Sequence, residues 1–134
     1  EFNDVEEIYV YDMEGSLIKK IKLTKKIDRV QGGKILGRHL YLTADDGGDT
    51  IYKVDIESGE VEVFLKIGTP FEMEGIEYLD GKIYVIVAVG GFQKNMLFTI
   101  DLAKQSIEAA TASYLIILSM IFTLSVAYII KKLI

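Results

Sequence analysis

Acidic side chains gather at two places in this 134-residue chain. The loop "ADDGGDT" carries Asp45, Asp46 and Asp49, and Glu74 stands directly before a glycine further along. Carboxylates beside flexible glycines could bind calcium, which takes six to eight oxygen ligands. The loop lacks the spacing of an EF-hand, and a solvated Asp/Gly turn is the alternative interpretation. We therefore predict these four residues as candidate metal ligands, with calcium as the candidate ion and a polar lining as the alternative for Glu74.

The sequence offers few residues for nucleophilic catalysis. His39 is the only histidine, so any Ser-His-Asp set would depend on it. The equivalent residue in the repeat described below is Lys82, which indicates a position that tolerates exposed polar groups. A phosphate-binding G-x-x-x-x-G-K-[ST] loop is absent from the sequence. We predict no catalytic residue and no bound organic cofactor.

The elements that would position these residues come from an internal repeat. Residues 32–59 match residues 75–105, with Gly32 on Gly75 and Asp55 on Asp101. A partial third copy precedes both, because "IYVYDMEGSLIKKIKL" (8–23) matches "IYKVDIESGEVEVFLK". The spacing is 43 residues and becomes 46 after three extra loop residues. A period of 40–50 residues with four short strands is typical of a propeller blade.

The expected strands of one unit follow from their composition. "HLYLTA" and "KIYVIVAV" are apolar on both faces, as the middle strands of a stacked sheet should be. "LIKKIKL" and "VEVFLK" mix in charged residues and follow short turns, which favours outermost strands. We predict a mainly β fold of about two and a half four-stranded, propeller-type blades over residues 1–102.

The stretch "FEMEGIEYLDGKIYV" (71–85), followed by "FTIDL", resembles a broad propeller group. The group includes SMP-30/gluconolactonase-like, NHL-like and SdiA-regulated or esterase-like-phytase-like proteins. In this group the acidic residue before the glycine, here Glu74, sometimes reaches the central channel and binds a metal. The equivalent residue in the preceding copy is Gln31. The resemblance covers residues 8–102 and identifies no single family.

Two and a half blades cannot close a ring of four to eight. We also expect the last blade to lack its fourth strand, because a helix is expected from about Ala103. The remaining blades would lie on a longer precursor or another chain, copies would associate, or the repeats would pack as a small sandwich. We favour missing blades or a partner, since repeat units need neighbours on both sides.

The C-terminal part, 103–134, predicts a membrane anchor. From Ala109 through Tyr114 to Ile130 there are 22 residues without a charge, which would span about 33 Å as a helix. Lys131 and Lys132 follow and favour a cytoplasmic C-terminus, with the N-terminal part outside the cell membrane. A dilysine retrieval signal is the alternative for the tail. An outward domain needs a signal peptide, so we expect Glu1 to be a processed or truncated end.

Bulk composition limits the partners. The net charge is −5, which argues against nucleic acid. Cysteine is absent, and lysine far outnumbers arginine, a bias of thermophiles.

Three functions remain open. The first is a membrane-anchored, outward-facing module for binding or assembly, with the bilayer and another chain or further copies as partners. The second is a metal-dependent hydrolase of the lactonase or phytase kind with Glu74 near the metal. The third is a structural subunit of a cell-envelope or membrane complex.

Overall fold

The structure is a computed structural model that describes residues 3–69, 71–89, 94–103 and 106–113, the last range by its backbone only. Ten antiparallel strands form three sheets in the described part of the chain. The first sheet contains β1 (Val5–Tyr11) and β2 (Leu17–Ile27). The second contains β3 (Val30–Leu36), β4 (His39–Ala44), β5 (Thr50–Asp55) and β6 (Val61–Lys66). The third contains β7 (Glu72–Leu79), β8 (Lys82–Val89), β9 (Lys94–Asp101) and β10 (Ser106–Ser113).

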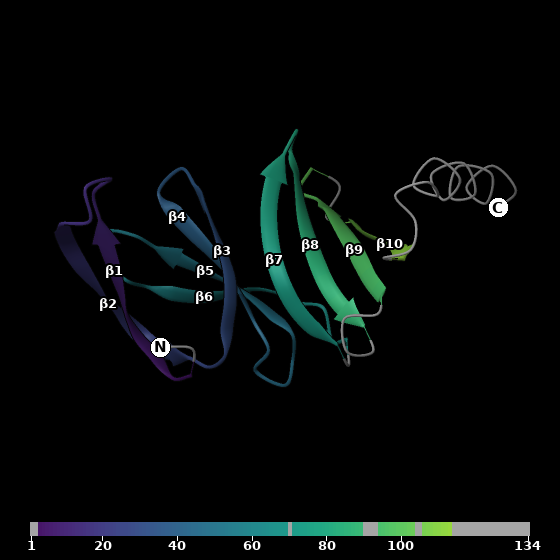
Figure 1. The fold of residues 1–134 in the computed structure, drawn as a ribbon, viewed down its shortest axis with the longest axis horizontal. Coiled ribbons are helices and arrows are strands. Elements are labelled where there is room, and N and C mark those ends of the chain that lie inside the picture. Colours follow the sequence, from purple (N-terminus) through teal and green to yellow (C-terminus); the bar gives the residue numbers. More distant parts are fainter. Residues whose placement is uncertain (1–2, 70, 90–93, 104–105, 114–134) are drawn as a thin grey trace, which may run out of the picture.

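The sheets stack face to face in chain order (Figure 1). Strands within the second and third sheets are joined in simple up-and-down order, so each repeat forms one sheet. The prediction of a mainly β fold built from successive repeat units is confirmed. Within the described ranges the three sheets form an open row, and no ring closes.

Two apolar layers hold the sheets together. Between the first and second sheets, Leu23 and Ile27 pack with Tyr52 and Val54. Between the second and third sheets, Ile51 packs with a larger set of fully or nearly fully buried side chains: Met73, Ile83, Val85, Val87, Phe98 and Ile100. Burying one such side chain contributes about 1.5–3 kcal/mol. An apolar layer therefore lies on each face of the second sheet, which explains why its middle strands are apolar on both sides.

Glycines allow the closest approaches between sheets. A Cβ atom on Gly32 of β3 would lie 2.8 Å from the Glu74 carbonyl oxygen of β7. A Cβ atom on Gly59, in the turn after β5, would lie 1.9 Å from the Lys22 carbonyl oxygen of β2. The Thr24 N–H donates to the Gly59 carbonyl oxygen at 2.9 Å, so the first two sheets are also hydrogen-bonded along their outer strands.

Strand β10 corrects two predictions. It pairs with β9 over its whole length, from Ser106 opposite Asp101 to Ser113 opposite Lys94. The third sheet therefore has its fourth strand, and the helix expected from Ala103 is wrong for residues 106–113. Ala109, the expected first residue of the membrane span, lies in this strand. The free edge of β9 offers a complete ladder of hydrogen bonds, which outweighs the helix propensity of the small residues in this segment.

The rest of the predicted anchor lies outside the described residues, including Tyr114, Ile130, Lys131 and Lys132. In the part of the chain that the structure describes, no helix is long and apolar enough to cross a membrane.

Candidate functional site

Asp45 lies between the second and third sheets and holds them together. Its carboxylate is buried and accepts two hydrogen bonds. Oδ1 accepts from the Met73 backbone N–H of β7 at 2.8 Å, and Oδ2 accepts from Nε2 of Gln31 at 2.8 Å. Its own N–H donates to the Arg29 carbonyl oxygen. Both carboxylate oxygens are thus used by protein donors on two different sheets.

Asp46 closes its own loop. Oδ1 accepts from the Gly48 N–H and from the Thr50 hydroxyl, and Oδ2 accepts from the Tyr52 hydroxyl at 2.5 Å. Burial acts to raise the pKa of Asp46, but the hydrogen bonds from Tyr52, Thr50 and Gly48 outweigh it, so the pKa is lowered. Burial, together with the bond to Asp46, raises the pKa of Tyr52 to about 12.

Asp49 fastens the connection between the second and third sheets. Its backbone adopts a positive φ of 45° and its side chain is buried. Oδ2 accepts from the Thr69 hydroxyl at 2.8 Å, and its carbonyl oxygen accepts from the Ile67 N–H. Burial raises the pKa of Asp49, and the nearby charges of Asp45 and Asp46 add to that effect.

The structure does not gather the four candidate metal ligands into a cage. Within the described ranges, no three Asp, Glu or His side chains are close enough to hold a metal ion. Asp45, Asp46 and Asp49 each accept hydrogen bonds from donors of the protein. Glu74 is half-buried on β7 and forms no ion pair or hydrogen bond through its side chain with a described residue. Calcium binding by these residues stays a prediction.

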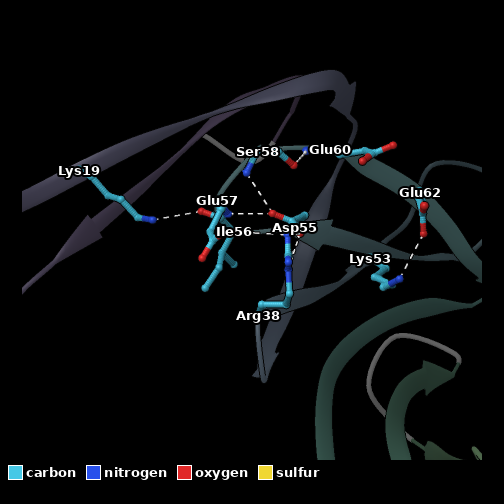
Figure 2. Close-up of polar contacts among 9 residues, drawn as sticks. All are labelled: Lys19, Arg38, Lys53, Asp55, Ile56, Glu57, Ser58, Glu60 and Glu62. Carbon is cyan, nitrogen blue, oxygen red and sulfur yellow. Dashed lines mark hydrogen bonds and ion pairs between the residues drawn. The ribbon is translucent and has the colours of Figure 1, made fainter.

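A corner at the end of β5 carries a contact set that the sequence pattern had not suggested (Figure 2). Oδ1 of Asp55 accepts from the N–H groups of Glu57 and Ser58 at 2.9 and 3.0 Å, and Oδ2 accepts from the guanidinium of Arg38. These backbone donors and Arg38 hold the pKa of Asp55 well below its usual range. The Ile56 N–H donates to the Arg38 carbonyl oxygen at 3.1 Å.

The same corner recurs in the repeat. Asp12, at the end of β1, accepts from the N–H groups of Glu14 and Ser16 through Oδ1. Asp101, at the end of β9, accepts from the Ala103 N–H through Oδ1. The aspartates that recur in the repeat therefore fold the turns after each third strand. His39 starts the strand beside this corner, opposite Asp55, and is half-buried with no described catalytic partner.

The third sheet presents an apolar row on the side away from the second sheet. Gly75, Ile86 and Leu97 lie directly opposite one another on β7, β8 and β9. The equivalent row of the second sheet is Gly32, Thr43 and Ile51. That row is packed against the third sheet, and the side chains of Thr43 and Ile51 are fully buried.

We call Gly75, Tyr84, Ile86 and Leu97 the terminal face. Ile86 is 46% exposed, and Tyr84 and Leu97 are partly exposed. A Cβ atom on Gly75 would meet nothing within 4 Å, whereas the equivalent Gly32 touches the next sheet. Among the described residues nothing covers this row.

No family model matches the chain, and no curated protein sequence matches it.

Proposed function

We propose that this chain is an assembly module that binds a further β-sheet on its terminal face, as part of a propeller-type stack. One observation carries the proposal: the terminal face repeats, position by position, a row that the molecule already uses to bind a sheet. Gly32, Thr43 and Ile51 pack against the third sheet, and their equivalents Gly75, Ile86 and Leu97 are uncovered in the described structure.

The chemistry of the row supports a sheet as the partner. A glycine in the first strand lets two backbones approach closely, as Gly32 does against Glu74 and Gly75. The branched side chains in the next two strands then fill the space between the sheets. Tyr84 adds an aromatic ring at the position where Tyr41 of the second sheet packs edge-on against Phe64, with ring centroids 5.1 Å apart.

The sequence supports attachment of this module to a membrane. Residues 109–113 of the predicted span lie in strand β10, which ends at Ser113. The uncharged run that follows, 114–130, has 17 residues, and as a helix it would measure about 26 Å, near the lower limit for a span. Lys131 and Lys132 follow it and favour a cytoplasmic end. We propose a single span with the sheets outside the cell membrane.

Native mass tests the assembly. The full chain, extracted in mild detergent from the cells that make it, should run as a complex larger than one 15.0 kDa chain in its micelle. Ile86→Lys should reduce the complex to the single chain, because it places a charge in the contact. Val63→Lys is the matched control, since Val63 is 47% exposed on an outer strand of the second sheet.

Two results would overturn the assembly proposal: a wild-type chain that runs alone, or a complex that Ile86→Lys leaves intact. Anchoring has its own readout. The wild-type chain should stay with membranes in alkaline carbonate, and removal of residues 114–134 should release it.

A further inference from the structure

The first sheet is the outer half of a repeat unit. By the repeat, β1 and β2 correspond to β5 and β6, the third and fourth strands of the second sheet. Strand β5 is hydrogen-bonded on both sides, to β4 and β6, and β9 is likewise between β8 and β10. Strand β1 pairs with β2 alone in the described structure. Its other edge is the place that two inner strands occupy in the other sheets.

The corner after β1 lacks one hydrogen bond that the other two corners make. The Ile56 N–H donates to the carbonyl oxygen of Arg38, in the turn between the two inner strands, and the Leu102 N–H donates in the same way to Gly81. Met13 is the equivalent residue. Its N–H has no acceptor among the described residues, and its side chain is 97% exposed.

At this corner only one of the two carboxylate oxygens of Asp12 accepts hydrogen bonds from described residues. Asp55 binds turn N–H groups through Oδ1 and the Arg38 side chain through Oδ2. Asp12 binds its turn through Oδ1 in the same manner, and Oδ2 has no cation or other donor in the described part of the chain. In the second sheet the inner turn brings Arg38 to the equivalent oxygen, whereas the third sheet has Gly81 at that position.

On the face that points to the first sheet, the second sheet also has an apolar side chain left uncovered. Ile35 of β3 lies on that face and is 61% exposed. Its repeat equivalent, Tyr78 of β7, packs into the apolar layer between the second and third sheets. Ile35 differs because no inner strand of the first sheet stands in front of it within the described residues.

A groove of about 630 Å³ lies along the first half of β1 and reaches Lys26 of β2. It is lined by Asp4, Val5, Glu6, Glu7, Tyr9 and Lys26. Lys26 is paired with Glu6 at 2.5 Å, so the lining keeps a net negative charge. The hairpin of residues 30–44, which fills the equivalent place in the second sheet, contains Lys34 and Arg38 and no acidic residue.

From these five observations we infer that the free edge of β1 binds a two-stranded β-hairpin from a polypeptide segment outside residues 1–134. The hairpin has apolar strands and a basic residue in its turn. Its inner strand edge adds to β1 through backbone hydrogen bonds. Its turn carbonyl accepts from the Met13 N–H, its basic side chain binds Oδ2 of Asp12, and its apolar side chains cover Ile35. This site lies at the opposite end of the stack from the terminal face, so its test is independent of that face.

A synthetic peptide of residues 30–44, labelled with a fluorophore, is the probe, and the full chain in mild detergent is the receptor. We expect saturable binding of one peptide per chain by fluorescence anisotropy. Asp12→Asn keeps the turn acceptor but removes the charge, and it should weaken binding about tenfold. Glu14→Gln, on the same turn, removes an equal charge from a side chain outside the contact and should leave binding unchanged.

Two further readouts define the geometry. A peptide with Arg38→Gln should bind the wild-type chain as weakly as Asp12→Asn binds the natural peptide, with no further loss when both changes are combined. Hydrogen exchange at the Met13 amide and along residues 5–11 should slow when the peptide is bound. Absent binding, equal affinity for Asp12→Asn, unchanged exchange, or dimerisation of the chain in place of peptide binding would each overturn the inference.

Discussion

Asp45 offers the sharpest test of how the second and third sheets are joined. Its two oxygens accept from the Met73 N–H and from Nε2 of Gln31, both at 2.8 Å, and the residue is 4% exposed. Asp45→Ala removes both acceptors at once. Asp45→Asn keeps an oxygen for the Met73 N–H, and the Gln31 amide can rotate to offer its own oxygen to the new amide.

The expected losses differ because the orphaned donors differ. A buried donor without an acceptor costs about 1–3 kcal/mol, so two such donors in Asp45→Ala should cost about 2–6 kcal/mol. Asp45→Asn leaves no donor unpaired and should cost under about 1.5 kcal/mol. The larger loss is a major part of the total stability of a small domain, which is about 5–15 kcal/mol.

Urea denaturation of the full chain in mild detergent, followed by circular dichroism, measures these free energies of unfolding. Asp28→Ala is the control, because Asp28 is a largely exposed neighbour and should change stability by no more than about 0.5 kcal/mol. If Asp45→Asn is as damaging as Asp45→Ala, the carboxylate acts through its charge and not through its two acceptors. If Asp45→Ala behaves like Asp28→Ala, the contact between the sheets is wrong.

Two other outcomes follow from the turn glycines and from the Tyr52–Asp46 pair. In urea denaturation, Gly59→Ala should lower the free energy of unfolding clearly more than Gly15→Ala. Both glycines have a positive φ, and an alanine in that conformation costs about 1–2 kcal/mol. Only at Gly59 would the added Cβ also collide with a backbone atom, the Lys22 carbonyl oxygen 1.9 Å away. Equal costs would contradict the close approach. The pKa of Tyr52 is raised from 10.0 to about 12, so its stabilisation is complete below pH 10 and is lost as the pH rises towards 12. Tyr52→Phe should lower stability near neutral pH and flatten that alkaline decline, and an unchanged decline would show that another group causes it.

The repeat predicted most of the fold because strand boundaries and layer order follow from local patterns. "HLYLTA" and "KIYVIVAV" coincide with β4 and β8 as observed. Strand β10 escaped prediction because its residues are small and good helix formers, and only the neighbouring edge of β9 makes them a strand. Such an edge is a tertiary feature that a single segment does not reveal.

The roles of the aspartates depended on contacts far apart in the sequence. The sequence predicted Asp45 as a candidate metal ligand, and that stays a prediction. Its observed role was not foreseen, because its partner Met73 is 28 residues away and no local pattern links the two. The turn aspartates had a readable signal. Asp12 and Asp55 each precede a short turn rich in Glu, Ser and Gly and recur in the repeat, which is typical of turn-forming aspartates, although the sequence prediction made no use of it.

Each sheet in this molecule has two chemically distinct faces, and all sheets point the same way along the row. A further sheet can therefore join such an array in one orientation only, because each end presents a different face. A tandem duplication of one 43-residue unit would lengthen the array without disturbing existing joints, whereas an insertion of half a unit would leave a mismatched joint.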